Sequence, residues 1–189
     1  MPNLYIISGP NGAGKTTASL QLLPQFLNCK EYVNADAIAS GLSPFNSDAV
    51  AIQAGRLMLQ RIEELASQKI DFAFETTLAS RSFAPFIKKC KKEGYTIILI
   101  YFYLHSEELA IQRVAERVAG GGHDIPLATI TRRYSRSLKN LVSLYLNNVD
   151  EFVMYDNSYS EGQIQIAEKK YGSPIHIIDD KIWQEINSI

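Results

Sequence analysis

Short apolar runs recur along the chain and are separated by segments in which apolar residues repeat with helical spacing. The runs cover residues 4–8, 31–34, 71–75, 96–104, 151–155 and 175–178. The run TIILIYFYL is apolar on both faces, which is typical of a parallel strand covered by helices on each side. The pattern therefore predicts an α/β fold, a three-layer sandwich whose mostly parallel sheet of five to six strands carries helices on both faces.

Three of the intervening segments carry the apolar stripe of an amphipathic helix, at residues 47–69, 106–119 and about 127–148. The stripes consist of Ile52, Met58, Leu59, Ile62, Leu65 and Ala66 in the first, Ile111, Val114, Ala115 and Val118 in the second, and Ile130, Tyr134, Leu138, Leu141 and Tyr145 in the third. We expect these residues to pack in the core. Ser47 or Asp48 can cap the first helix, and the glycines at 120–122 end the second.

Composition indicates one compact domain over residues 1–189. The chain has no internal repeat and no linker rich in Pro, Gly or Ser. Its formal net charge of −1 argues against a protein whose main task is to grip nucleic acid, so a nucleic-acid partner is not expected. Cys29 and Cys90 lack metal-ligand spacing, and no run resembles a signal peptide or a membrane span. We therefore expect a reduced, cytoplasmic protein without a membrane partner.

The stretch GPNGAGKTT, directly after the first apolar run, fits the P-loop pattern GxxxxGK[ST] between a strand and a helix. Glycines that adopt positive φ turn successive N–H groups inward, and the helix N-terminus adds partial positive charge, so the loop can cradle phosphate. The sequence predicts a bound nucleoside triphosphate, ATP or GTP, with Mg²⁺ on the Thr16 hydroxyl. The expected nucleotide contacts are Gly9, Asn11, Gly12, Ala13, Gly14, Lys15, Thr16 and Thr17.

Polar residues follow the second and third predicted strands. In a parallel sheet ligands collect at the carboxyl ends of the strands, so Asp36, Glu75 and Thr77 are candidate site residues. Asp36 could accept the proton of an attacking hydroxyl, or it could simply cap the helix that begins there. For Glu75 the ordinary alternative is a cap or an ion pair.

Arginines flank the glycines at 120–122, and a lid over the phosphates is expected at about residues 113–136. Mobile, cationic segments of this kind close over a transferring phosphoryl group and exclude water. The cations are Arg113 and Arg117 before the glycines, and Arg132, Arg133, Arg136 and Lys139 after them. Arg117 and Arg133 are the preferred pair, although any one of these arginines could instead belong to a solvated helix face.

These motifs occur in the same order as in zeta-toxin-like P-loop kinases, which the chain resembles over nearly its whole length. They are GPNGAGKTT, NADAIASGLSP, FAFETTLASRS, RVAERVAGGGHDIP with RRYSRSLKNL, and YDNS. The resemblance implies a kinase fold with five core parallel strands and a lid, phosphorylation of a hydroxyl of UDP-N-acetylglucosamine by ATP or GTP with Mg²⁺, and an antitoxin partner. It further implies that Lys15 is the P-loop lysine, Asp36 the catalytic base, Glu75 and Thr77 the sugar-binding pair, and Arg117 the first lid arginine.

The chain departs from the family pattern at two positions. Ala79 stands where the toxins have a substrate-binding arginine, and Arg81 is the nearest cation. The second lid arginine of the toxins falls on Gly-Gly-His, so His123, Arg132 or Arg133 must supply that charge.

Together these features predict an enzyme that phosphorylates a hydroxyl of a small metabolite, such as a nucleotide sugar. Asp36 activates the acceptor, Glu75 and Thr77 position it, and Arg56 and Arg81 assist. A nucleic-acid end kinase is the first alternative, because RRYSRSLK is locally basic. The second is a nucleotide-binding or ATPase regulatory protein without kinase activity.

Overall fold

The structure is a computed structural model that describes residues 1–122, 124–160 and 162–189. Its strands are β1 (Asn3–Ser8), β2 (Tyr32–Val33), β3 (Phe72–Thr76), β4 (Thr96–Tyr103), β5 (Glu151–Asp156), β6 (Ile164–Lys169) and β7 (His176–Ile177). Its helices are α1 (Lys15–Gln25), α2 (Ala35–Leu42), α3 (Ala51–Gln68), α4 (Phe83–Lys92), α5 (Glu107–Ala119), α6 (Leu127–Asn140) and α7 (Asp180–Asn187). A 3-10 turn, η1 (Ser47–Val50), precedes α3, and a π-helical turn, η2 (Leu141–Tyr145), continues α6.

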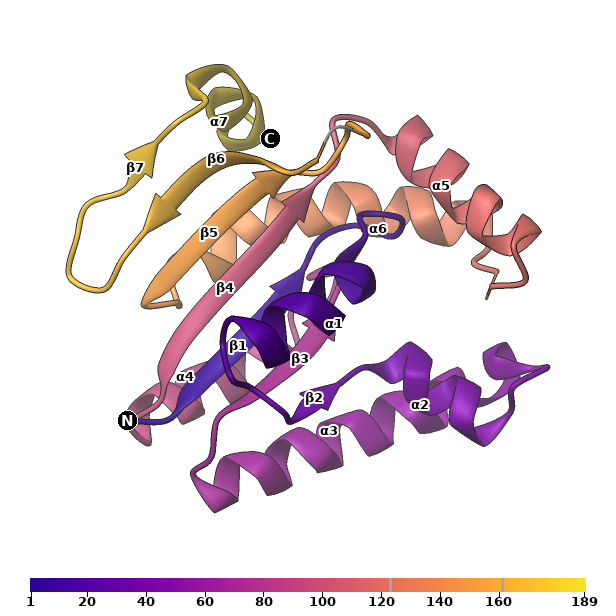
Figure 1. The fold of residues 1–189 in the computed structure, drawn as a ribbon, viewed down its shortest axis with the longest axis horizontal. Helices are drawn as coiled ribbons and strands as arrows, with labels where there is room; N and C mark the ends of the chain where they lie inside the picture. Colours follow the sequence, from indigo (N-terminus) through magenta and orange to yellow (C-terminus); the bar gives the residue numbers. More distant parts are fainter. Residues whose placement is uncertain (123, 161) are drawn as a thin grey trace.

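The described residues form one sheet of seven strands in the order β2-β3-β1-β4-β5-β6-β7 (Figure 1). The first five of these strands are parallel, whereas β6 and β7 are antiparallel to their neighbours. The predicted α/β fold with a mostly parallel sheet is confirmed. The pattern of apolar runs missed β6 because its sequence IQIAEK is half polar and buries only Ile166 and Ala167.

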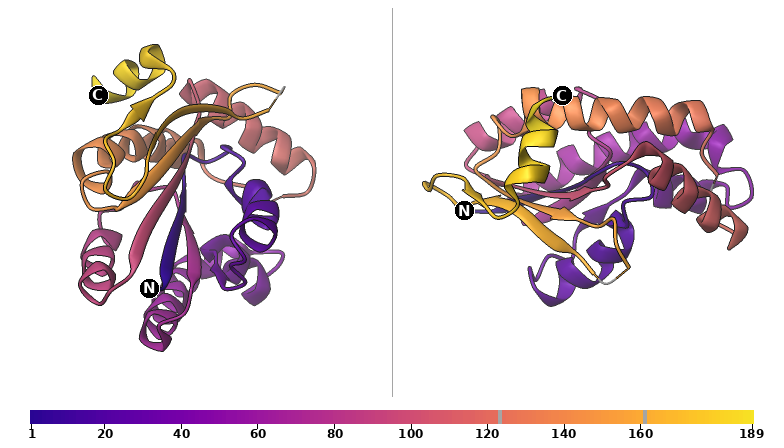
Figure 2. Two further views of the ribbon diagram at one scale, coloured as in Figure 1. Left: turned by 60° about the vertical axis from the view of Figure 1, so that its left-hand side comes forward. Right: turned by 90° about the horizontal axis from the view of Figure 1, so that it is seen from above.

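Alternating residues of the central strands supply two hydrophobic layers, one on each face of the sheet. In β1, Leu4 and Ile6 face the layer built by α3, α4, η2 and α7, while Tyr5 and Ile7 face the layer built by α1 and α5. Figure 2 shows α3 and α6 on the opposite side of the sheet from α1. This arrangement brings the loops after β1, β2 and β3 together at one edge of the sheet.

The expected stripe of α3 is only partly core. Met58, Ile62 and Leu65 are buried, but Ile52 is 76% exposed and Leu59 is 43% exposed. Both side chains line a cavity instead of packing in the core. Ala115 of α5 is also exposed, so its assignment to the core was wrong.

The predicted helix boundaries hold for α5, and the helix predicted at residues 47–69 is observed as η1 followed by α3, without the predicted side-chain cap. The Ser106 hydroxyl caps α5 by accepting a hydrogen bond from Leu109 N at 3.2 Å, and Gly120 ends the helix. By contrast, α3 begins at Ala51 after η1, and no side chain caps it. The cap predicted from Ser47 or Asp48 was therefore wrong, because the chain enters α3 through a tighter helical turn.

Candidate active site

Residues 9–14 of the GPNGAGKTT segment form the loop between β1 and α1, and Lys15 begins α1. Gly9 has φ 142°, and a Cβ there would lie 2.3 Å from the Phe102 carbonyl oxygen. Gly14 has φ 75° and immediately precedes α1, and a Cβ there would lie 2.7 Å from Asn157 Nδ2. Only glycine fits such positions without strain. The loop thus has the positive-φ backbone that directs N–H groups toward an anion.

Lys15 is buried in this loop, with 7% of its side chain exposed, and its Nζ donates a hydrogen bond to the Pro10 carbonyl at 2.9 Å. Burial lowers the pKa of Lys15, the negative charges of Glu75 and Asp36 act against this, and the charges of Arg117 and Arg133 add to the lowering. Both arginines therefore lie close enough to the P-loop for their charges to act on Lys15. Arg133 also lines the cavity beside the loop, whereas Arg117 does not.

Asn34 and Asp36 have different tasks at the start of α2. Asn34 is the N-cap, and its Oδ1 accepts hydrogen bonds from the backbone N–H of Asp36 at 2.8 Å and of Ala37 at 3.2 Å. The alternative that Asp36 itself caps the helix is thereby excluded. The exposed Asp36 side chain instead lines the cavity that Lys15 also lines.

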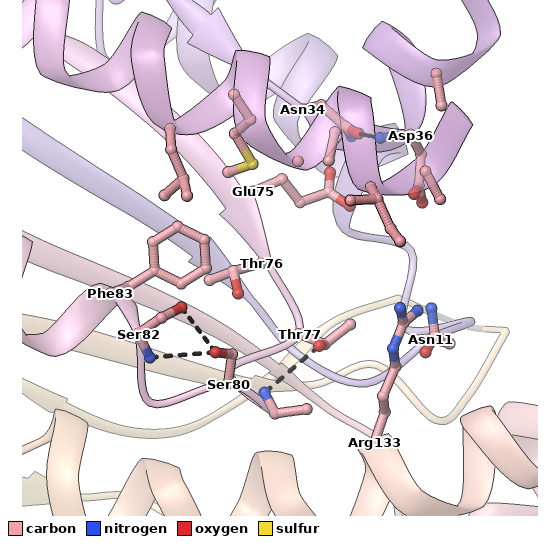
Figure 3. Close-up of a pocket in the computed structure, with 18 of the residues that line it drawn as sticks. Asn11, Asn34, Asp36, Glu75, Thr76, Thr77, Ser80, Ser82, Phe83 and Arg133 are labelled. Carbon is pink, nitrogen blue, oxygen red and sulfur yellow. Dashed lines mark hydrogen bonds between the residues drawn. The ribbon is translucent and has the colours of Figure 1, made fainter. Parts of the chain in front are cut away.

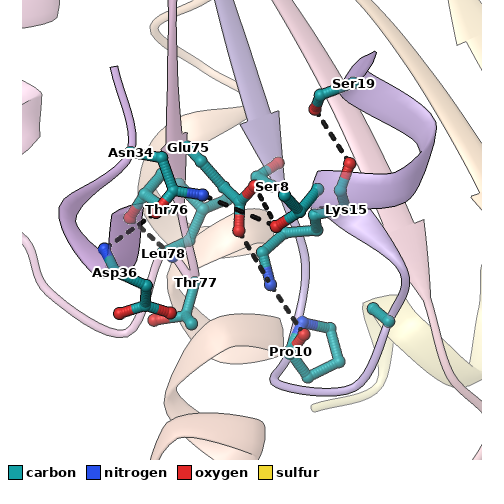
Figure 4. A network of polar contacts seen from close by, with 12 residues as sticks. Ser8, Pro10, Lys15, Ser19, Asn34, Asp36, Glu75, Thr76, Thr77 and Leu78 are labelled. Atoms are coloured by element: carbon teal, nitrogen blue, oxygen red, sulfur yellow. Dashed lines mark hydrogen bonds and ion pairs between the residues drawn. The ribbon is translucent and has the colours of Figure 1, made fainter. Parts of the chain in front are cut away.

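Glu75, at the end of β3, contacts the P-loop. Its Oε2 accepts hydrogen bonds from the Thr16 hydroxyl at 2.9 Å and from the Tyr32 hydroxyl. Its Oε1 lies 3.9 Å from Lys15 Nζ (Figure 4). Asn34 Nδ2 donates to the Tyr32 hydroxyl at 3.2 Å. Burial raises the pKa of Tyr32, and the neighbouring charge of Glu75 adds to it, so the phenol remains a hydrogen-bond donor. Neither Tyr32 nor Asn34 was among the residues predicted for the site.

A cavity of about 620 Å³ opens beside this network (Figure 3). Its charged lining residues are Lys15, Asp36, Arg56, Glu75, Arg132, Arg133 and Arg136. Figure 3 shows the side chains of Asp36 and Arg133 directed into the cavity from α2 and α6. Ile52, Met58 and Leu59 of α3, with Phe83 of α4, add an apolar wall. The space therefore suits a ligand that carries both anionic and apolar parts.

The Asn11 side chain places an oxygen without a hydrogen-bond partner among the described residues in the cavity lining. Asn11 is 5% exposed and lines the cavity, and its Oδ1 accepts no hydrogen bond from the described residues. A buried oxygen without a donor is costly, so a bound ligand or a water that donates to it is expected.

The loop at residues 77–82 lines the cavity, and its backbone carbonyls accept hydrogen bonds from side chains of α6 and η2. Leu78 has φ 57°, which is unfavourable for a residue with a side chain, and its carbonyl accepts a hydrogen bond from Asn140 Nδ2 at 2.8 Å. The Tyr145 hydroxyl, in η2, donates to the Ser80 carbonyl. Asn140 and Tyr145 hold a strained loop in place, and strained backbone is concentrated at functional sites.

The predicted lid cations have different surroundings in the structure. Arg113 donates from Nη1 to the Asn157 carbonyl at 2.6 Å and from Nη2 to the Ser158 carbonyl at 3.1 Å, so it ties α5 to the loop after β5. Asn157 Nδ2 in turn donates to the Ala13 carbonyl of the P-loop at 2.9 Å. Arg132 and Arg133 both line the cavity. His123, the other candidate for the second lid cation, lies outside the described residues.

Arg81 does not line the cavity, so its expected contact with the substrate is not supported. Arg81 lies near Tyr145 of η2 instead. Burial raises the pKa of Tyr145 to about 12, and the positive charge of Arg81 acts in the opposite direction. Arg56, Thr77 and Ala79 line the cavity as expected for residues near an acceptor. With Ala79 in place of an arginine, the arginines that line the cavity are Arg56 of α3 and Arg132, Arg133 and Arg136 of α6.

Comparisons with known proteins bear on this geometry. The family model described as zeta toxin matches residues 1–169. The chain belongs to the zeta toxin family. This confirms the resemblance inferred from the motifs, and it makes the chain a P-loop kinase by family as well as by fold. In the part of the chain that the structure describes, no helix is long and apolar enough to cross a membrane.

Individual relatives show how far the likeness reaches. An uncharacterized protein of Haemophilus influenzae is 31% identical over 126 residues, which are 67% of this chain and 88% of that protein. A chain of the AvrRxo1-ORF1:ORF2 complex, solved with ATP, matches with a TM-score of 0.82 and 16% identity. The match covers 99% of this zeta toxin chain and 64% of the AvrRxo1 chain. The PezAT toxin-antitoxin system of Streptococcus pneumoniae gives a TM-score of 0.65 and 17% identity over 92% and 74% of the two chains. At these identities the solved structures show a shared fold.

Proposed function

We propose that this zeta toxin family member transfers the γ-phosphoryl group of ATP or GTP to a hydroxyl of a small metabolite, with a nucleotide sugar such as UDP-N-acetylglucosamine as the first candidate. One observation carries the proposal: Asp36, whose carboxylate does not cap α2, lines the same cavity as the P-loop Lys15. A base and a phosphate-binding cation on one cavity are what in-line transfer to an alcohol requires.

On the phosphate side, the loop at residues 9–14 holds the β-phosphate through backbone N–H groups, and Lys15 exchanges its bond to the Pro10 carbonyl for phosphate oxygens. A magnesium ion fits here, because Thr16 and Glu75 supply oxygen donors 2.9 Å apart. No group of three or more His, Cys, Asp or Glu among the described residues could hold a metal, so phosphate and water would complete its shell. When bound, Mg²⁺ neutralises charge on the β- and γ-phosphate oxygens.

On the acceptor side, Asp36 orients the attacking hydroxyl and accepts its proton. Thr77 and Arg56 position the acceptor in our proposal, and Arg132 or Arg136 takes the place of the arginine that Ala79 replaces. The wall of Ile52, Leu59 and Phe83 covers the less polar part of the acceptor. Burial of apolar ligand surface against it is worth about 25 cal/mol per Å².

The lid supplies positive charge when the segment at about 113–136 closes. Arg117 and Arg133 then neutralise charge that spreads over the transferring oxygens, and closure excludes water that would otherwise attack the nucleotide. Arg132 is the alternative to Arg133, because both line the cavity.

The partner and the location are also proposals. The solved AvrRxo1 and PezAT structures are described as an ORF1:ORF2 complex and a toxin-antitoxin system, which supports an antitoxin that restrains this chain. A reaction that consumes ATP fits the expected cytoplasmic location.

Phosphorus NMR with a panel of acceptors tests the function. The purified chain is mixed with Mg²⁺ and ATP or GTP, and then with UDP-N-acetylglucosamine, other nucleotide sugars, simple sugars, or an oligonucleotide with a free 5′-hydroxyl. We expect a new phosphomonoester signal with a small-molecule acceptor and none with Lys15→Ala. Phosphorylation of the oligonucleotide alone would favour an end kinase, and release of inorganic phosphate with every acceptor would favour an ATPase.

A further inference from the structure

The Asn157 side chain fixes the direction of one peptide unit of the P-loop. Its Nδ2 donates a hydrogen bond to the Ala13 carbonyl at 2.9 Å. The Ala13 carbonyl and the Gly14 N–H belong to the same peptide unit, and in a planar trans peptide these two groups point in opposite directions. The Gly14 N–H is therefore directed away from Asn157. Because Gly14 directly precedes α1, this N–H is among those that the proposed function assigns to phosphate.

The loop that carries Asn157, directly after β5, is itself held at several points. The Asn157 N–H donates to the Tyr103 carbonyl at the end of β4 at 3.0 Å. The Ser158 hydroxyl accepts a hydrogen bond from His105 N at 2.9 Å and donates to the Asp156 carboxylate. Both Ser158 and Asp156 are buried. Asn157 is thus presented to the P-loop from a segment that is bonded to the neighbouring strand and to the residues after it.

Arg113 of α5 adds a further support. Its guanidinium donates to the Asn157 carbonyl at 2.6 Å and to the Ser158 carbonyl at 3.1 Å. The donors of a guanidinium form a rigid planar fork, so they restrict the orientation of two successive carbonyls. Arg113 was expected among the lid cations, but two of its nitrogens are engaged with backbone carbonyls of the loop after β5.

The P-loop packs directly against these supports. Gly12 has φ 77°, and a Cβ there would lie 2.9 Å from the Ala110 carbonyl oxygen and 3.1 Å from Arg113 Cβ. A Cβ at Gly14 would lie 2.7 Å from Asn157 Nδ2. No room separates the loop from α5 or from the side chain that holds it, so a displacement of either support reaches the loop backbone.

We infer that Asn157 and Arg113 are positioning residues of the phosphate site: Asn157 orients the peptide unit between Ala13 and Gly14, and Arg113 orients Asn157. Neither side chain touches the phosphates in this arrangement. The inference rests on the proposed function only in requiring that the loop at residues 9–14 binds phosphate. It assigns Arg113 to the fixed frame of the site instead of the moving lid.

Calorimetry with two probes tests the inference without turnover. Dissociation constants are measured in Mg²⁺ for AMP-PNP directly and for inorganic tripolyphosphate by competition, with the wild type, Asn157→Ala, Arg113→Ala and the double variant. A hydrogen bond within a protein is worth a factor of roughly 3 to 10, so we expect Asn157→Ala to weaken both probes by about that factor. Arg113→Ala should weaken both probes by less. The double variant should bind about as well as Asn157→Ala, because Arg113 acts through Asn157.

Matched variants control for general damage. Gln112→Ala changes the residue beside Arg113 on α5 and removes the hydrogen bond from its Nε2 to Glu116 at 2.8 Å. Asn187→Ala, in α7, removes a donor to the Trp183 carbonyl at 2.7 Å. Both variants should bind both probes as the wild type does. If Asn157→Ala does not fold, Arg113→Ala decides, because it removes the support and leaves the loop sequence intact.

Three outcomes would contradict the inference and leave the proposed kinase intact. Weaker binding of AMP-PNP with unchanged binding of tripolyphosphate would assign Asn157 to the nucleoside. Losses that multiply in the double variant would mean that Arg113 acts on the phosphates independently. Wild-type affinities in both single variants would remove the positioning role. A wild type that binds AMP-PNP but not tripolyphosphate would also refute the inference, whereas one that binds neither would overturn the kinase proposal with it.

Discussion

Asn34 and Asp36, two residues apart, separate the structural and chemical tasks at the start of α2. Asn34 satisfies two N–H groups of the first helical turn, and this leaves the Asp36 carboxylate available to the cavity. Such an N-cap contributes about 1 kcal/mol (range about 0.5–2) to stability. We predict that Asn34→Ala lowers the free energy of unfolding in urea by about that amount, and that Asp36→Asn changes it by less than about 0.5 kcal/mol. Equal losses in both variants would mean that Asp36 shares the capping role.

The two cysteines provide a second test at this scale. Burial raises the pKa of Cys29 and of Cys90 to about 11, and each side chain is 2% exposed or less. Only about one thiol in a thousand is then ionised at pH 8, and the thiolate is the reactive form. We predict that a thiol reagent labels neither cysteine in the native chain and both after unfolding. Rapid labelling of the native chain would contradict the role in packing.

At the scale of elements, the end of α6 contacts the loop at residues 77–82, which lines the cavity, through the hydrogen bond from Asn140 to the Leu78 carbonyl. Replacement of Asn140 by Ala leaves the buried Leu78 carbonyl without its donor, which costs about 1–3 kcal/mol. We predict a lower unfolding free energy and a higher KM for the acceptor, with nucleotide affinity unchanged. Asn148→Ala is the control, because Asn148 donates to the Leu144 carbonyl within its own segment at 2.6 Å. An equal rise in both KM values would show general loosening.

The cations of α6 and α5 test the proposed lid. Loss of one preorganised donor to transition-state charge typically lowers kcat by 10²-fold to 10³-fold, and we predict a fall of about that size for Arg133→Ala and for Arg117→Ala. Nucleotide affinity should change by no more than a few fold. Arg61→Ala, which removes surface ion pairs with Glu31 and Glu64, should leave kcat unchanged. If kcat survives in Arg133→Ala and falls in Arg132→Ala, Arg132 is the second lid cation.

Elements with local signals were predictable from the sequence, and contacts across the sheet were not. The P-loop motif and the polar residues after β2 and β3 have recognisable local patterns. Tyr32 gives no such signal, because its hydroxyl meets Glu75 only through the pairing of β2 with β3. The exposed wall of Ile52 and Leu59 was likewise assigned to the core, because helical spacing cannot tell a face over the sheet from a face over a cavity.

At the scale of the whole molecule, β1 lies between β3 and β4, so the P-loop that follows it has site residues on both sides. On one side β2 and β3 bring Asn34, Asp36 and Glu75, and on the other β4 and β5 lead into α5 and the loop that carries Asn157. The order β2-β3-β1-β4-β5 therefore lets an acceptor approach from one side while the lid helices begin on the other. Strand order was not predicted, because it depends on crossover connections that apolar runs do not encode.

The most direct test of this account compares the wild type with Asp36→Asn in a single turnover of γ-labelled ATP, with ATP affinity measured on the same samples. The account predicts that both bind ATP with affinities within a few fold of each other. The wild type should move the label to a small-molecule alcohol, and Asp36→Asn should do so at least about 100-fold more slowly, as expected for loss of a general base. Transfer at the wild-type rate by Asp36→Asn would contradict the account, as would label that appears only in inorganic phosphate.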